Sequence, residues 1–287
     1  MSANYWTSSQ RNKWQFSRKG LRDARSSVTK MEIQLYGNES IMKYDINMRI
    51  YLHQLIIKLG RKLNLRQIIL STAEVYLTRF FVRVSIREIN IYLLVTTCIY
   101  IACKMEESPQ HIRTILSEAR NCWPEFIPND LTKLAEFEFY LIEELDCYMV
   151  VHHPYNSILE MVNVLKNGDM ASRLEVLPEE LQTCWSIVND SYITDLHLLF
   201  PPHVIATGTL YLTLVLGADV RKSMNNISKT QNPRIEAFVN FLAASNIDLD
   251  EVIETIQELL TLYDAWNSYD EMYIKNGLHQ MLLNMNR

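Results

Sequence analysis

The stretch from Ile91 to Cys103 holds thirteen consecutive residues without a charge, a glycine or a proline. A helix that is apolar on every side cannot lie at a protein surface, so other helices or lipid must surround it. At about 1.5 Å per residue it reaches roughly 20 Å, whereas the hydrocarbon core of a bilayer is about 30 Å thick. We therefore expect the central helix of a helical bundle and no membrane partner.

The composition favours a chain that is helical nearly throughout. Its 287 residues, 48% hydrophobic and 21% charged, suffice for two medium domains. Only 7 glycines and 8 prolines, with long stretches of 3.6-residue periodicity, favour helices over strands. The five cysteines form no Cys-x-x-Cys pair and are typical of small core residues in a reducing compartment. Because the first thirty residues lack a hydrophobic signal core, we expect a cytoplasmic or nuclear location.

An acidic pair, Glu106 and Glu107, follows the buried stretch just before Pro109. The carbonyls of a helix C-terminus carry partial negative charge and favour basic side chains, by a few tenths of a kcal/mol up to about 1. Lys104 fits this rule and the two acids oppose it. The pair is either a solvated turn or a contact for a group outside the helix.

The first domain is predicted to contain five helices, with apolar faces on both sides of the buried stretch. The faces outside that stretch are Met48, Leu52, Leu55, Ile56, Leu59 and Leu63; Ile69, Ala73, Tyr76, Leu77 and Phe80; Ile112, Ile115, Leu116 and Ala119; and Leu131, Leu134, Leu141, Ile142 and Leu145. Glu138 interrupts the last face, and a buried carboxylate without a partner costs several kcal/mol. We predict a Lys104–Glu138 ion pair near the surface; the alternative is that Glu138 flanks the face and reaches water.

From Tyr155 the helical pattern repeats, and 204–216 is a second thirteen-residue chargeless run, which Gly217 should close as a C-cap. Asp248, with Glu251 three residues later, should cap a long last helix, and the polar stretch 221–233 should be a loop. The second copy has neither a lysine nor an acidic pair after its run, so we expect the function on the first repeat. The predicted organisation is an arm at 1–40, a first repeat at 41–153, a second repeat at 154–270 and a tail at 271–287.

The arm combines aromatic and basic residues, namely Tyr5, Trp6, Trp14 and Phe16 among Arg11, Lys13, Arg18 and Lys19. Such a segment either packs on its own domain or docks into a partner. The net charge is −5 and the first thirty residues carry +6, which leaves −11 on the rest of the chain. We therefore expect no direct binding of nucleic acid.

Sequence motifs of enzymes are absent: there is no phosphate-binding glycine loop, no His-Glu-x-x-His, no Gly-x-Ser-x-Gly and no metal-type Cys/His spacing. A capping or core role is expected for His197 and His203. We predict no enzymatic activity, no cofactor and no metal.

Two repeats of five helices, with a buried third helix that runs into Lys-x-Glu-Glu and a glutamate on the fifth, resemble the cyclin box. The resemblance is specific to the cyclin C group, which serves the Mediator kinase module, and within it to the fungal forms. It covers residues 4–270 and rests on Tyr5-Trp6-x-Ser8-Ser9, Glu138-Phe139-Tyr140-Leu141, His153-Pro154-Tyr155, Val188-Asn189-Asp190-Ser191-Tyr192, Leu199-Phe200-Pro201-Pro202 and the loop at 123–128.

The resemblance implies a non-enzymatic nuclear subunit that activates the cyclin-dependent kinase of the Mediator kinase module and so regulates transcription by RNA polymerase II. Its partners would be that kinase and the other subunits of the module. The kinase-binding residues that it implies are Lys104, Glu106, Glu107, Glu138, Tyr5 and Trp6. Transcription factor IIB, a promoter-complex binding module, also has two cyclin folds, but it would predict a zinc ribbon and a basic face that this sequence lacks.

The segment 48–52 is similar to the docking-patch motif of cell-cycle cyclins, with two departures. Leu55 stands where those cyclins have a tryptophan, and Thr78 stands where an aspartate would pair with Arg49. The resemblance therefore does not support substrate docking at this patch, and it leaves Arg49 without an obvious partner.

Overall fold

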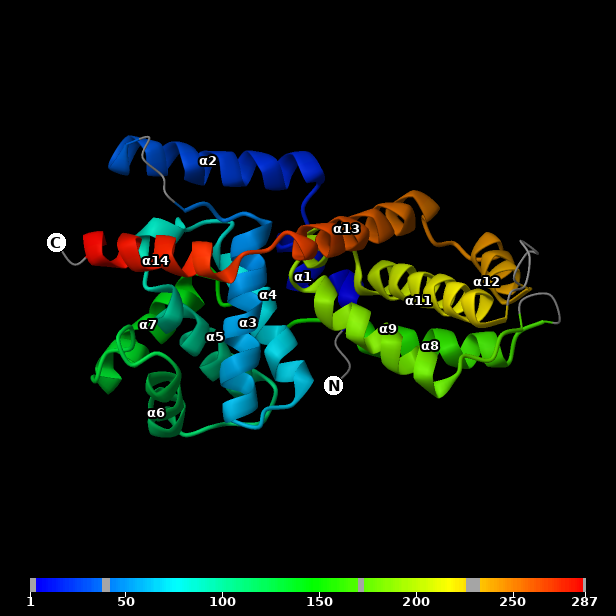
Figure 1. Ribbon diagram of the computed structural model, residues 1–287, viewed down its shortest axis with the longest axis horizontal. Coiled ribbons are helices and arrows are strands. Elements are labelled where there is room, and N and C mark those ends of the chain that lie inside the picture. Colours follow the sequence, from blue (N-terminus) through cyan, green and yellow to red (C-terminus); the bar gives the residue numbers. More distant parts are fainter. Residues whose placement is uncertain (1–3, 38–41, 170–172, 226–232, 286–287) are drawn as a thin grey trace. The chain divides into compact units, whose positions relative to one another are not determined.

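The computed structural model describes residues 4–37, 42–169, 173–225 and 233–285, and all regular structure in these ranges is helical (Figure 1). This confirms the predicted all-α fold class. Contacts divide the chain into two compact units, residues 1–151 with 262–287 and residues 152–261. Each unit is described by itself below.

The first unit begins with two short helices and one long helix of the arm, and five helices form its centre. The elements are η1 Tyr5–Thr7, α1 Ser9–Lys13, α2 Arg18–Tyr36, α3 Ile46–Lys62, α4 Gln67–Phe80, η2 Ile86–Glu88, α5 Ile91–Met105, α6 Ile112–Cys122, α7 Leu131–Glu144 and α14 Glu271–Met285. Helix α13 spans Leu249–Asn267, and its residues from Leu262 onward also belong to this unit.

Helix α5 is the core of the first unit, as its sequence predicts. Every residue from Ile91 to Cys103 is buried, and α3, α4, α6 and α7 pack against the helix. Asn90 is the N-cap of the helix, and its side chain accepts hydrogen bonds from the backbone N–H groups of Tyr92 and Leu93. Such a cap satisfies donors that a helix leaves open at its N-terminus.

The C-terminal helix α14 packs against α3 and completes the core of the first unit. Ile274, Leu278 and Met281 are its buried residues, spaced four and three apart as one face of a helix requires. The Tyr269 hydroxyl, just before this helix, donates to Gln54 on α3 at 3.0 Å. Residues that the sequence places in a tail after the second repeat thus group with the first unit.

The second unit contains α8 Pro154–Lys166, α9 Pro178–Ser191, α10 Leu196–Leu199, α11 Pro202–Asn225, α12 Pro233–Ala243 and most of α13. Helix α11 is its centre and packs against α8, α9 and α12. The predicted C-cap at Gly217 is wrong, because α11 continues to Asn225. The predicted loop at 221–233 is therefore helical at its start, and residues 226–232 lie outside the described part of the chain.

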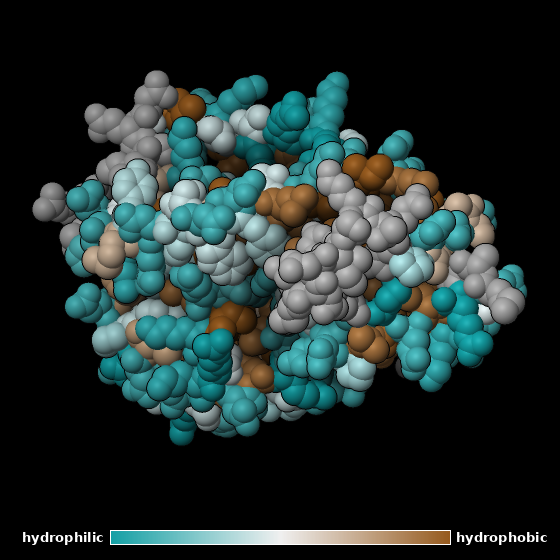
Figure 2. Space-filling view, turned by 45° about the vertical axis from the view of Figure 1, so that its right-hand side comes forward, coloured by the Kyte–Doolittle hydropathy of each residue, from teal (hydrophilic) through white to brown (hydrophobic). Residues whose placement is uncertain are grey.

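Within the described residues, no helix has both the length and the apolar character that crossing a membrane would require. Figure 2 shows a face covered mainly by hydrophilic residues, with hydrophobic residues in small separate patches. The apolar character of Ile91–Cys103 is used inside the first unit, where the whole stretch is buried.

Candidate functional site

The predicted ion pair between the end of α5 and the middle of α7 is present. Lys104 Nζ lies 2.5 Å from Glu138 Oε1, and the two side chains are 40% and 16% exposed. The lysine also lies over the ring of Tyr100, with Nζ 4.1 Å from the ring centroid. The end of α5 and the middle of α7 thus carry an ion pair in contact with an aromatic ring at the surface of the first unit, and Lys104 is its more exposed member. We call this surface around Lys104 and Glu138 the rim.

The protonation of Lys104 follows from these contacts. Partial burial by itself lowers the pKa of the ammonium group, but the hydrogen bonds to Glu138 and Tyr100 outweigh it, and the pKa is raised overall. Lys104 is therefore cationic at neutral pH, and the pair presents a fixed positive charge with its counter-ion beside it.

Glu106 turns toward the protein. It is the C-cap of α5, and its Oε1 accepts a hydrogen bond from the Thr72 hydroxyl on α4 at 2.7 Å. Its backbone oxygen accepts one from the Arg66 guanidinium at 3.3 Å. These two contacts explain why an acid is tolerated where the helix dipole disfavours it, because a hydroxyl binds the carboxylate and a cation binds the terminal carbonyl.

Glu107 faces solvent in a left-handed backbone conformation, with φ of 51°. The N–H of Ser108 bonds to the carbonyl of Cys103 at 2.9 Å, and that of Glu107 to the carbonyl of Lys104. This is a Schellman end, whose left-handed position is usually glycine, since other residues are less stable there by about 1 kcal/mol. A glutamate at this position therefore destabilises the folded state locally, and its carboxylate is exposed three residues after Lys104.

Two exposed apolar residues beside the ion pair are absent from the predicted site. Phe139, which follows Glu138, is 74% exposed, and Met105, which follows Lys104, is also exposed. The sequence held a signal for Phe139, since a residue one step past the face of a helix lies about 100° away from it. Phenylalanine and methionine are enriched at protein–protein interfaces relative to the rest of the surface.

The tip of the arm carries Tyr5 and Trp6 in η1. The Tyr5 hydroxyl donates to Gln15 Oε1 at 2.6 Å, and its ring meets that of Trp6 edge-on at 5.4 Å between centroids. Trp6 itself is 57% exposed, and the Arg11 guanidinium lies over its ring at 5.9 Å. The tip is thus an ordered aromatic segment with an indole facing solvent.

Trp14, by contrast, packs the arm onto the first unit. Its side chain is 1% exposed and lies against two arginines of α4 and the following turn, Arg79 at 5.3 Å and Arg83 at 4.8 Å from the ring. Arg79 is fully buried and donates to the Tyr148 carbonyl, and burial lowers the pKa of its guanidinium to about 10. The sequence leaves local packing and partner docking open for the arm; Trp14 packs locally while Trp6 faces solvent.

The segment similar to a docking patch presents no apolar surface. Met48, Tyr51 and Leu52 are buried in the core that α14 completes. The Arg49 guanidinium lies over the ring of Tyr44 at 5.1 Å, which supplies a contact that the sequence does not predict.

Each unit buries histidine or cysteine side chains in its interior, namely Cys98 and Cys103 in the first unit and His197 and Cys184 in the second. His197 is buried, stacks on Tyr192 at 3.8 Å and is hydrogen-bonded to Ser191, which confirms the core role predicted for it. Cys98, Cys103 and Cys184 are buried, whereas Cys147 is exposed. Among the described residues, no group of histidines, cysteines and acids is arranged to hold a metal ion.

Comparisons with known proteins agree with this architecture. Residues 23–150 match the family model of the cyclin N-terminal domain. The chain is similar to a chain of the CAK complex from Chaetomium thermophilum (TM-score 0.67, 17% identity, covering 98% of this chain and 88% of that one). It is also similar to a chain of yeast TFIIK (TM-score 0.62, 20% identity, covering 90% and 99%). At these identities the solved structures show the fold alone.

Curated relatives share much higher sequence identity with the chain than these solved structures do. The RNA polymerase II holoenzyme cyclin-like subunit of Scheffersomyces stipitis is 47% identical, and the alignment covers 99% of each chain. The protein of that description from Saccharomyces cerevisiae is 44% identical, with 99% of this chain and 98% of the relative covered. The fold, the cyclin-domain match and these near full-length identities lead to one conclusion: the chain belongs to the cyclin family, in the group of RNA polymerase II holoenzyme cyclin-like subunits.

Proposed function

We propose that the chain is the regulatory, activating subunit of the Mediator-associated cyclin-dependent kinase and acts in transcription by RNA polymerase II. The observation that carries the proposal is the Lys104–Glu138 pair, held half-exposed at the end of the central helix of a cyclin box. Relatives named for the RNA polymerase II holoenzyme, aligned over almost the whole chain, support the setting. The chain would act in the nucleus, together with other subunits of the Mediator kinase module.

The proposed action is mechanical and requires no catalytic group in this chain. The rim around Lys104 and Glu138 would press on the regulatory helix of the kinase and hold it in the position that aligns its ATP site. Phe139 and Met105 would supply apolar contact area, and the charge pair would fix the orientation. Tyr5 and Trp6 would grip the kinase from the arm, because the exposed indole offers a large, rigid contact.

The two acids have separate roles in this proposal. Glu107 is exposed and would meet a basic group of the kinase. Glu106 bonds to Thr72 and would act by holding the end of α5 in shape. Changing both residues at once would mix a lost contact with a damaged helix end, so the decisive variant changes Glu107 alone.

The test is a peptide-phosphorylation assay on the purified Mediator-associated kinase, with and without the chain. Glu107→Asn removes the charge, and asparagine tolerates the left-handed backbone better than most residues do. We expect stimulation by the native chain and a higher half-maximal concentration for Glu107→Asn. Glu236→Gln, which removes an exposed carboxylate from α12 in the second unit, should behave as native.

Two results would contradict the proposal. The first is an absence of both stimulation and co-purification with the kinase. The second is salt-dependent DNA binding without stimulation, which would favour a promoter-binding module of the transcription factor IIB kind. Stimulation that Glu107→Asn leaves unchanged would keep the function and remove Glu107 from the contact surface.

A further inference from the structure

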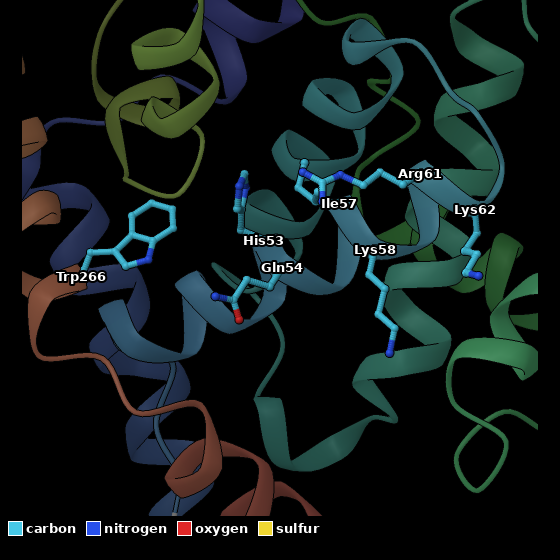
Figure 3. Close-up of a pocket in the computed structure, with 7 residues that line it drawn as sticks. All are labelled: His53, Gln54, Ile57, Lys58, Arg61, Lys62 and Trp266. Carbon is cyan, nitrogen blue, oxygen red and sulfur yellow. The ribbon is translucent and has the colours of Figure 1, made fainter.

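A pocket of about 640 Å³ lies in the first unit, on a face of α3 that holds none of the residues of the proposed kinase surface. Six of its lining residues come from α3, and the seventh is near the end of α13: His53, Gln54, Ile57, Lys58, Arg61, Lys62 and Trp266 (Figure 3). Figure 3 shows Arg61 extending back along α3 toward His53, with Trp266 at the far end of the row. Pockets of this volume hold small ligands or a few residues of a peptide.

Three cations line this pocket and no acid does; Figure 3 shows Arg61 directed toward His53, whereas the side chains of Lys58 and Lys62 extend in another direction. Lys58, Arg61 and Lys62 are all exposed, and none of their side chains forms a hydrogen bond or ion pair with the part of the chain that the structure describes. Like charges three and four residues apart on a helix repel by about 0.2–0.5 kcal/mol per pair. The helix dipole favours Arg61 and Lys62 in the last turn, but Lys58 lies one turn earlier.

The other lining residues give the pocket a fixed, partly apolar wall. His53 is held by Glu74, with Nδ1 2.8 Å from Oε1, and its ring meets the Trp266 indole edge-on at 6.2 Å. Gln54 Oε1 accepts a hydrogen bond from the Tyr269 hydroxyl at 3.0 Å, which leaves the amide NH2 of Gln54 as a donor. Ile57 and Trp266 are half-buried, so apolar surface adjoins the three cations.

We propose that this pocket binds a short segment of a partner protein that carries a phosphorylated serine or threonine. A phosphate of charge near −2 can bond to more than one of the three cations at once, and a guanidinium can bind it through two parallel hydrogen bonds. The indole and Ile57 would accept an apolar side chain next to the phosphoresidue. The proposal does not depend on kinase activation, since it uses other residues.

Charge complementarity selects this ligand over two others. A glutamate or aspartate side chain carries one negative charge and would leave most of the cationic cluster uncompensated. A nucleic acid carries a charge on every phosphate and needs a basic track beyond one pocket. The chain beyond its first thirty residues instead has a net charge of −11, which repels a polyanion.

The test compares two fluorescein-labelled pools of nine-residue peptides, degenerate except for a central phosphoserine in one and serine in the other. Fluorescence anisotropy with the full chain should show at least tenfold tighter binding of the phosphoserine pool. Lys58→Gln/Lys62→Gln should weaken that binding at least tenfold, because it removes two of the three cations. Arg113→Gln/Arg120→Gln, which removes two cations from another hollow of the first unit, should have no effect.

Any of the following results would overturn the proposal: equal affinity for the two pools, equal loss in the two double variants, or tighter binding of a single-stranded RNA that depends on Lys58 and Lys62. Inorganic phosphate that binds as tightly as the phosphopeptide pool would also overturn it, because the peptide would then contribute nothing. Kinase stimulation should be unchanged in Lys58→Gln/Lys62→Gln, so failure here is separate from failure of the proposed function.

Discussion

Helices α5 and α11 are the two buried centres of the molecule, and they end in opposite ways. Each contains thirteen consecutive residues without charge. Helix α5 stops at Met105, where Glu106 bonds to Thr72 and Glu107 takes a left-handed backbone. Helix α11 passes through Gly217, the residue that should end it by sequence rules, and continues to Asn225.

Contacts across the fold, rather than the identity of one residue, therefore decide where each of these buried helices ends. Within the described residues, Gly37 is the only glycine with a positive φ. Gly217 thus lies inside a helix, where glycine is weaker than alanine by about 0.5–1 kcal/mol. Glu107 occupies the position that glycine favours, and the end of α5 is held by side chains from α4 and α7.

Reversing the Lys104–Glu138 pair should give the largest effect. Lys104→Glu places two acids together and should lower both the melting temperature and the affinity for the kinase. The double variant Lys104→Glu/Glu138→Lys restores an attractive pair, so we expect the melting temperature to recover. Kinase affinity should stay at least about 30-fold weaker, since losing one partner of a charged interface contact typically costs 2–5 kcal/mol.

The control for this experiment is Lys133→Glu/Glu136→Lys, which swaps another ion pair on α7 in which both side chains are largely exposed. This variant should change neither the melting temperature nor the affinity for the kinase, because exposed ion pairs contribute little to stability. If the swap of Lys104 and Glu138 restores kinase affinity along with stability, the pair serves only the fold, and the proposed contact surface is wrong.

The next largest effect should separate the two acids at the end of α5. Glu106→Ala removes the acceptor of the Thr72 hydroxyl and should lower the free energy of unfolding by about 1–2 kcal/mol. Glu107→Asn should leave it unchanged within about 0.5 kcal/mol, as surface changes usually do. Urea denaturation of both variants measures the difference, and equal stability of the two would show that the Thr72 contact carries no energy.

A smaller effect is expected from giving each helix end the residue that its backbone prefers. Glu107→Gly should stabilise the protein by up to about 1 kcal/mol, because glycine adopts the left-handed conformation without cost. Gly217→Ala should stabilise by a similar amount of about 0.5–1 kcal/mol, because the helix continues there. Glu107→Ala is the control and should not stabilise; a loss of stability in Gly217→Ala would mean that α11 ends near residue 217.

The smallest effect concerns pH. The pKa of Lys104 in the folded protein is raised above its ordinary value of 10.5, so the pair should contribute fully below that pH and be lost as pH rises through the raised pKa. The difference in melting temperature between native and Lys104→Met should therefore shrink above pH 10.5. Tyrosines that do not contact Lys104 are common to both proteins and cancel in the difference, and a Tyr100→Phe background in both proteins removes the tyrosine that Lys104 contacts. A constant difference would contradict an ionic contribution.

Several properties of this protein followed from its sequence alone. The chargeless run of Ile91–Cys103 predicted the central helix, because a helix without a polar side must be enclosed. The interruption of an apolar face by Glu138, with Lys104 at the end of that central helix, predicted the ion pair, which the structure places at 2.5 Å. Such predictions are possible because the buried face of a helix recurs about every 3.6 residues, so a charge on that face stands out in the sequence.

Other properties were decided only by the tertiary structure. Thr72 and Glu106 are 34 residues apart, and no local pattern joins them or separates Glu106 from Glu107. The packing of α14 on α3, the burial of Trp14 and the exposure of Trp6 likewise depend on which surfaces meet in space. Sequence periodicity predicts which face of a helix is buried. Which helix packs against that face, and at which residue the helix ends, depend on contacts between segments that are distant in the sequence.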